Sequence, residues 1–426
     1  MMVMLKRFLI SDKNKARSAV IWNAFSAIMN SFQTMVLLMV ITHCGSMEDS
    51  GAFVMAYAVG NLMLNIGKYG VRQFQVTDAY EKYSFHTYLR SRQYTTLLMV
   101  IFSVLYVGYN AIFSQYSAKK ILIVLLICLM KAIEAYEDVY HGRMQQMGRL
   151  DIAGKILGVR LSIFIVGYGV GYIWTRDIIL TTLVNVLVTL VLALILNALV
   201  QKEFHLYEHD KQGDSVTQLL LECLPLCVCM CLNMYIANAP KYVIDTIVSD
   251  DIQTCFNIVF MPVFIIALLA NFIFQPCLKH IGELWSYNEH KKFMRYIVVL
   301  AAVVIGICFA ITFVGALIGV DILGFIYQVD LSSYNNLLII FMLSGGVIAL
   351  QNLFIMALTV VRYQKYMIYG YIVIALLMLV TGNHILNDYG IEWLSWGYLI
   401  TMIILLIYCM ALLGVAMKRQ SVDIKD

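Results

Sequence analysis

The chain has 426 residues, of which 61% are hydrophobic and 13% charged, with a mean hydropathy of +0.80 and a formal net charge of +4. Ordinary globular domains carry about 25% charged residues, so this composition excludes a soluble globular protein and indicates a polytopic membrane protein. The small net charge says little about partners, because the distribution of Lys and Arg among the loops matters more than their sum.

The segment Met1–Arg17 is basic, but no short apolar run with a small-residue cleavage site follows it, so we expect no cleavable signal peptide. Ten cysteines lie mostly within apolar segments and form no CxxC or Cys/His pattern. We expect buried thiols, and neither a metal site nor a cofactor.

Twelve apolar segments are long enough to cross a bilayer at a rise of about 1.5 Å per residue. In chain order they are 19–41, 52–70, 94–114, 119–140, 156–174, 178–200, 216–237, 252–277, 296–320, 337–361, 366–386 and 393–417. Long aromatic loops follow both the second and the eighth segment, which favours two six-helix lobes related as parallel repeats. We therefore predict an all-α integral membrane protein with lobes 1–200 and 216–426, joined by a cytoplasmic loop at 201–215.

The basic residues set the orientation. With the N-terminus inside, 24 of the 30 Lys and Arg residues fall in cytoplasmic segments and two fall within spans, while four fall outside, namely Lys119, Lys120, Arg176 and Lys241. This asymmetry predicts that both termini are cytoplasmic.

Polar residues form a stripe along the first span, at Asn23, Ser26, Asn30, Gln33 and Thr34, within an arc of roughly 100°. Amides that faced lipid would lack hydrogen-bond partners, so the stripe must face other helices or a watery cavity. Similar stripes recur on other spans, which favours a common water-accessible interior. Their members are Asn61, Asn65, Lys68 and Arg72 on the second span, Lys131, Glu134 and Asp138 on the fourth, Glu222 and Asn233 on the seventh, Asn257 on the eighth, and Gln351 and Arg362 on the tenth.

Lys131 lies about ten residues into the fourth span, near the bilayer midplane, where a charge costs at least ~2.5–3.5 kcal/mol on insertion scales. Glu134, three residues on, can neutralise it. Either the two form a structural pair, or Lys131 is held in a cavity for an anionic ligand. Arg160 on the fifth span supplies a second cation.

All four prolines lie at 225, 240, 262 and 276, so we expect the seventh and eighth spans to be bent.

Two stretches of the sequence carry a recognisable pattern. They are Gly45, Gly51-Ala52-Phe53, Ala56, Asn61 and Tyr69-Gly70-Val71-Arg72, and then Glu137–Arg143 with Gln146, Gly148-Arg149 and Gly154. Both stretches resemble bacterial polysaccharide flippases of the Wzx type, which belong to the MOP exporter superfamily with MATE transporters and the lipid II flippase MurJ.

The resemblance implies a twelve-helix carrier of the bacterial cytoplasmic membrane that moves an undecaprenyl-pyrophosphate-linked oligosaccharide from the inner to the outer leaflet by alternating access. It implies a cationic central cavity, for which Lys68, Arg72, Lys131 and Arg160 are the candidates by position. Expected partners are the lipid-linked substrate, membrane lipids, and the glycan polymerase and glycosyltransferases of such a pathway, with no nucleic acid. Whether H⁺ or Na⁺ drives the cycle stays open.

Two other functions are considered. A MATE-like drug or cation antiporter of the same fold is the nearer alternative, although the first span has no acid of the kind that cation-coupled relatives use. A membrane enzyme of glycan assembly is less favoured, because the sequence has no DxD, GxSxG, HExxH or P-loop motif and no large outer loop.

Overall fold

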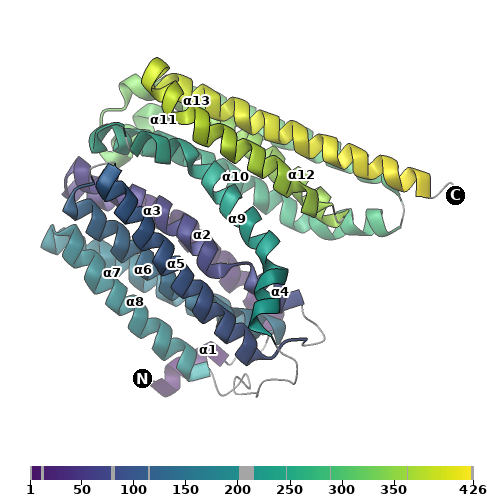
Figure 1. The fold of residues 1–426 in the computed structure, drawn as a ribbon, viewed down its shortest axis with the longest axis horizontal. Helices are drawn as coiled ribbons and strands as arrows, with labels where there is room; N and C mark the ends of the chain where they lie inside the picture. Colours follow the sequence, from purple (N-terminus) through teal and green to yellow (C-terminus); the bar gives the residue numbers. More distant parts are fainter. Residues whose placement is uncertain are drawn as a thin grey trace. The chain divides into compact units, whose positions relative to one another are not determined.

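The computed structural model describes residues 2–10, 14–77, 82–113, 116–200, 215–245, 247–287, 289–361 and 363–423, and the regular elements within these ranges are helices. The long helices are α2 (Lys15–Cys44), α3 (Met47–Lys68), α5 (Phe85–Phe113), α6 (Ala118–Gln146), α7 (Leu150–Thr175), α8 (Ile178–Val200), α9 (Val216–Asp245), α10 (Asp250–Ser286), α11 (His290–Tyr327), α12 (Asn335–Val360) and α13 (Met367–Asp423) (Figure 1). The short ones are α1 (Met2–Ile10) and α4 (Val71–Thr77).

The prediction of twelve spans in an all-α membrane protein is confirmed. Within the described residues, ten helices are long and apolar enough to cross a membrane, a count that takes α13 once and leaves out the charged α6. Gly390, with φ 85° and ψ −174°, interrupts α13, so its two halves correspond to the eleventh and twelfth predicted spans. With α6 and both halves of α13, the total is twelve. Pro225 and Pro240 lie within α9, and Pro262 lies within α10. The bend that we expect in these two helices stays a prediction.

Some helices extend beyond the predicted spans, and this corrects the placement of several basic residues, among them Arg92 and Lys241. Helix α5 begins at Phe85, so Arg92, which we predicted in a cytoplasmic loop, lies within a helix and is buried. Helix α9 ends at Asp245, so Lys241, which we predicted in an outer loop, lies within α9 and is also buried. Hydropathy does not reveal these extra turns, because their polar side chains are buried against neighbouring helices.

The described chain divides into two compact units, Met1–Met234 and Tyr235–Asp426. The first holds α1 to α8 and the first part of α9, and the second holds the end of α9 with α10 to α13. The predicted inter-lobe loop at 201–215 lies, apart from Ser215, outside the described residues, and the predicted lobe limits stay a prediction.

In the first unit, α2 packs along α7, and α3 packs along α6. Helix α7 approaches α2 closely at Gly154, where an added Cβ would lie 3.0 Å from the backbone nitrogen of Asn23. The missing side chain therefore brings the two backbones together. In the second unit, Gly345 of α12 makes a similar approach to Val263 of α10, with 3.0 Å from an added Cβ to the Val263 Cα.

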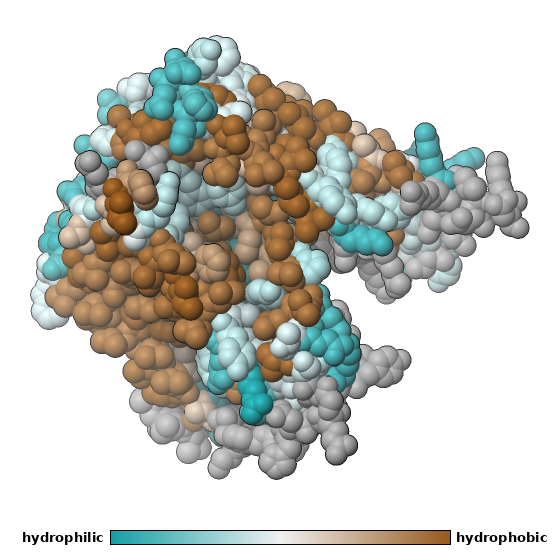
Figure 2. Space-filling view, in the orientation of Figure 1, coloured by the Kyte–Doolittle hydropathy of each residue, from teal (hydrophilic) through white to brown (hydrophobic). Residues whose placement is uncertain are grey.

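Large apolar side chains are exposed along the spans, as a lipid-facing surface requires. On α5, for example, Leu105 is 61% and Ile112 is 74% exposed. Figure 2 shows apolar side chains over much of the visible face, with hydrophilic ones gathered toward the ends of the helices. Such a surface would be an aggregation hazard in water and is stable in a bilayer.

The predicted orientation can be tested at two exposed positions on either side of α11. We expect a cysteine at Ser333, in the loop after α11, to react with a membrane-impermeant maleimide added to whole cells, and a cysteine at Lys292, at the start of α11, to be protected until the cells are opened. Both variants need a background in which the ten native cysteines are replaced. The opposite labelling pattern would reverse the topology.

Candidate functional site: a buried charge network around α6

The turn between α3 and α4 directs one arginine toward α6. Helix α3 ends at Tyr69, which has φ 50° and donates its N–H to the Asn65 carbonyl at 2.9 Å, and Gly70 follows with φ 71°. Two successive residues with positive φ reverse the chain, and glycine adopts this conformation without steric cost. The side chain of Arg72, in the first turn of α4, then reaches Asp138 of α6.

Two lysines share one carboxylate near the middle of α6. Glu134 receives Lys131 Nζ on Oε2 at 3.0 Å and Lys68 Nζ on Oε1 at 3.1 Å. Lys131 is also 5.5 Å from the centre of the buried Tyr57 ring. The predicted pairing of Lys131 with Glu134 is therefore present, and Lys68 from α3 is a second partner that helical spacing did not reveal.

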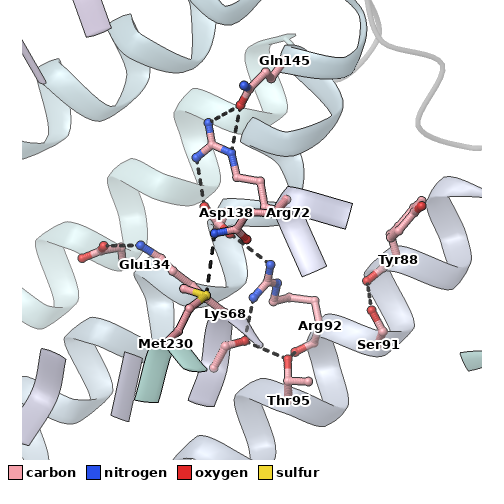
Figure 3. A network of polar contacts seen from close by, with 12 residues as sticks. Lys68, Arg72, Tyr88, Ser91, Arg92, Thr95, Glu134, Asp138, Gln145 and Met230 are labelled. Atoms are coloured by element: carbon pink, nitrogen blue, oxygen red, sulfur yellow. Dashed lines mark hydrogen bonds and ion pairs between the residues drawn. The ribbon is translucent and has the colours of Figure 1, made fainter. Parts of the chain in front are cut away.

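One turn further along α6, Asp138 holds two arginines (Figure 3). Its Oδ1 accepts from Arg72 Nη1 and its Oδ2 from Arg92 Nη2, both at 3.0 Å. Arg92 is fully buried, and its Nη1 also donates to the Gly67 carbonyl at 2.6 Å. Arg72 in addition donates through Nε and Nη2 to Gln145 Oε1, at 3.2 and 2.9 Å. Asp138 thus ties α4 and α5 to α6.

The third carboxylate of α6, Glu137, faces α7 and α8. Its Oε2 lies 3.0 Å from Arg160 Nε, and its Oε1 accepts from Asn197 Nδ2 at 2.8 Å. His141 Nε2 lies 3.8 Å from the same carboxylate. Arg160, a predicted site residue, is therefore paired with one acid through Nε, while its Nη2 is buried without a hydrogen-bond partner among the described residues.

A small cavity lies beside Lys131, Glu134 and Arg160 of this network, with a volume of ≈ 10 Å³, about the space that one water molecule needs. Its polar lining comes from four helices and consists of Gln33, Lys131, Glu134, Arg160 and Thr189. The Oγ1 atom of Thr189 is buried without a hydrogen-bond partner, as is Arg160 Nη2. The residues that line the cavity therefore include two cations, Lys131 and Arg160. They also include an Arg160 N–H donor and a Thr189 hydroxyl without hydrogen-bond partners among the described residues.

Positive charge exceeds negative charge in the described network. Five basic side chains, Lys68, Arg72, Arg92, Lys131 and Arg160, face three carboxylates, Glu134, Glu137 and Asp138. The carboxylates fall two short of the bases, and Lys68 and Arg72 are 27% and 28% exposed, so water reaches these two cations. The network therefore carries a formal excess of two positive charges.

Glu222, near the start of α9, forms an ion pair with a lysine that lies outside its own helix. Lys82, which precedes α5, donates to Glu222 Oε1 at 2.7 Å. The hydrogen bond to Glu222 raises the pKa of Lys82, so this lysine stays protonated at neutral pH. Both side chains are partly exposed, and solvent screening keeps the stability contribution of such a pair small.

The other predicted site residues lie elsewhere. On α2, Asn23 Nδ2 donates to the carbonyls of Ala19 and Leu150 at 2.6 and 3.2 Å, which makes it a link to α7. Asn30 is exposed and accepts from Gln33 Nε2 at 3.1 Å. On α3, Asn65 Nδ2 donates to the Asn61 carbonyl at 3.0 Å. Of the predicted polar stripe on α2, Gln33 lines the cavity.

In the remaining helices the predicted residues are dispersed. Asn233 on α9 is exposed, whereas Asn257 on α10 is fully buried. Gln351 Nε2 donates to the Met402 carbonyl at 2.6 Å and so joins α12 to α13. Arg362 lies outside the described residues.

Sequence reasoning missed Arg92, Glu137 and Lys241 as functional candidates. Glu137 lies three residues from Glu134, about 60° around the helix at roughly 100° per residue, and faces α7 and α8, so a search along one stripe of α6 did not include it. Throughout the described ranges, no group of three or more His, Cys, Asp or Glu side chains could hold a metal ion.

No protein-family model and no curated protein matches the sequence. Several solved structures match the chain by fold. An outward-facing multidrug resistance MATE family transporter of the MOP superfamily matches with a TM-score of 0.60 at 14% identity, over 97% of this chain and 98% of that one. The Vibrio cholerae MATE transporter VcmN in the bent form gives 0.63 at 13% identity, over 98% and 99%. A MOP superfamily transporter from Pyrococcus furiosus, described by the reverse polarity of its binding pocket, gives 0.59 at 13% identity, over 97% and 98%.

The chain therefore has the fold of the MATE transporters of the MOP superfamily, as the sequence resemblance implied. At these identities the likeness is one of fold, and it leaves the substrate open.

Proposed function

We propose that this protein is an alternating-access transporter that flips a lipid-linked oligosaccharide across the bacterial cytoplasmic membrane. The substrate class is an undecaprenyl-pyrophosphate carrier bearing a surface polysaccharide repeat unit. The proposal rests on the two-base excess of the network around α6 and on the unused donor of Arg160 at its cavity.

The physical argument concerns the anionic headgroup. A pyrophosphate must leave water and enter an interior of low dielectric, where fixed cations offset its desolvation cost. Lys131 and Arg160 line the cavity, and Arg160 has a guanidinium donor with no partner among the described residues. Glu134 would hold Lys131 and Lys68 in the empty state and release them to the arriving phosphate. A cavity of ≈ 10 Å³ must open to admit such a group.

A MATE-like antiporter of drugs or cations is the second candidate, and the fold supports it equally. A cation carrier needs an acid that is free to bind the cation. Helix α2 contains no Asp or Glu, and each carboxylate of α6 in the network is held by at least one base. These observations favour an anionic substrate. Enzyme activity is not proposed, since the proteins that share this fold are transporters.

The test is expression in two bacterial hosts, one lacking its own polysaccharide flippase and one lacking its drug exporters. We expect surface glycan to return in the first host, and drug sensitivity to stay unchanged in the second. In the first host, Arg160→Gln should impair glycan display more than Arg160→Lys, because lysine keeps the charge and loses the planar fork of donors. Drug resistance without glycan display, at matched protein levels, would replace the flippase proposal with the antiporter.

A further inference from the structure

Lys241 differs from the five basic residues of the network around α6 because no described carboxylate holds it. Its side chain is 7% exposed, and its Nζ lies over the rings of Phe260 and Phe264, 5.0 and 5.1 Å from their centres. Among the described residues no Asp or Glu pairs with it. Aromatic faces attract a cation, but they carry no compensating charge.

The ammonium lies deep in the second unit. Helix α10 begins at Asp250, so Phe260 and Phe264 are roughly 15–21 Å along it at a rise of about 1.5 Å per residue. This depth is about half the thickness of a hydrocarbon core of about 30 Å. An uncompensated charge at that depth is costly, and an ionisable group there is by default a candidate for function.

A hydrogen bond joins α9 and α10 close to Lys241. Gln253 Nε2 on α10 donates to Asp245 Oδ1 on α9 at 2.9 Å, one turn beyond Lys241. On the same face of α10 as the two phenylalanines, Asn257 Oδ1 and Gln253 Oε1 are buried without hydrogen-bond partners. These oxygens offer acceptors that an ammonium can use once the packing loosens.

Among the described residues, α12 and α13 bring no buried counter-charge to Lys241. Helix α12, which packs on α10 through Phe341 and Phe260, has no acidic or basic residue in its sequence. From α13, Tyr398 packs against Phe260 and donates its hydroxyl to the Ala237 carbonyl at 3.3 Å. The ionisable residues His384, Asp388 and Glu392 of α13 are exposed, and Asp245 on α9 is bound by Gln253.

We propose that Lys241 is a proton-exchange site of the transport cycle. In the packed arrangement its amine carries no proton, and it takes one from water when the face between α9 and α10 opens. The step moves a single proton between water and Nζ and changes no other bond. The inference rests on the proposed transport cycle and names the residue through which H⁺ would be coupled to it.

The test measures stability against pH and needs no substrate. Full-length protein and Lys241→Met are purified in the same detergent and melted at several values from about pH 6.5 to about pH 9.5. If folding removes the proton, the unfolded chain binds more protons, and the stability of the native protein rises with pH through this group. Methionine has a similar length and no charge, so we expect the variant to melt higher at low pH, by a few degrees, and the difference to shrink as pH rises.

Two further variants sharpen the outcome. Lys131→Met, which removes a buried lysine that has a carboxylate partner, should melt lower than native protein across the whole range. Lys241→Arg keeps a permanent charge, so it should melt lower than Lys241→Met at every pH. Parallel melting curves for native protein and Lys241→Met would overturn the proton-exchange site. Since no transport is measured, that result would leave the flippase proposal untouched.

Discussion

Asp138→Asn is expected to lower the free energy of unfolding by about 3–5 kcal/mol, the usual cost of removing one partner from a buried ion pair. The carboxylate holds Arg72 and Arg92 at 3.0 Å each, and Arg92 is fully buried. Asparagine keeps the shape but loses the charge, and it leaves two guanidinium groups without compensation. The measurement is the melting temperature and the yield of folded protein in detergent.

Asp330→Asn is the matched control for this experiment. Asp330 is exposed in the loop after α11, and its carboxylate accepts one hydrogen bond, from the Ser332 N–H at 3.0 Å. Its substitution should change stability by less than about 1 kcal/mol. Adding Arg92→Met to Asp138→Asn should recover part of the loss, because one orphaned buried cation is then removed. Native stability in Asp138→Asn would show that the network is solvated and not a dry core.

The second large effect concerns the lysines around Glu134. A simple exchange of Lys131 and Glu134 would test whether the two are merely a pair, but the structure makes that exchange unsuitable. Lys68 also lies 3.1 Å from the Glu134 carboxylate, so a lysine at 134 would face Lys68. The appropriate variant reverses all three charges, as Lys68→Glu, Lys131→Glu and Glu134→Lys, which again places one side chain between two of opposite sign.

We expect the triple variant to fold, because the alternation of charge is retained, and to transport about 10- to 100-fold less than native protein. That range corresponds to about 1.5–3 kcal/mol, the value of one hydrogen bond to a charged group. The physical reason is that Lys131, which lines the cavity, and Lys68, which shares Glu134 with it, have become carboxylates while one lysine is gained, so the net charge of the three side chains changes from +1 to −1 and repels a phosphate. Transport is read as surface glycan in a flippase-deficient host, normalised to protein level.

The surface pair Lys292 and Glu289 provides the control, since it has the same i, i+3 spacing with a 2.8 Å contact. Exchanging those two residues should leave both folding and glycan display unchanged. Full activity in the triple variant would mean that the lysines only neutralise Glu134, and the phosphate role would then be lost.

Hydropathy and helical periodicity are local properties of the sequence. The features that depend on them, the membrane spans and the polar stripes, could therefore be predicted from the sequence alone. The twelve spans follow from runs of apolar residues, and Gly390 separates the last two spans where the hydropathy dips. The concentration of polar residues on α3 and α6 also followed from their spacing. Lys131 and Glu134 are three residues apart on one helix, so their contact was predictable from helix geometry alone.

The choice of partners was decided by the tertiary structure. Lys68 and Glu134 are 66 residues apart, and Arg92 and Asp138 are 46 apart, so only the packing of α3 and α5 against α6 brings them together. From the sequence, Lys131 had Glu134 as a possible partner and Arg160 had none, whereas the structure shows Lys131 sharing Glu134 with Lys68, and Arg160 paired with Glu137 but keeping a donor without a partner among the described residues. Lys241 was assigned to a loop because hydropathy falls at the end of α9. Lys241 nevertheless lies within α9, where Phe260 and Phe264 of α10 cover its side chain. A polar side chain can be buried in this way wherever a neighbouring helix replaces the water around it.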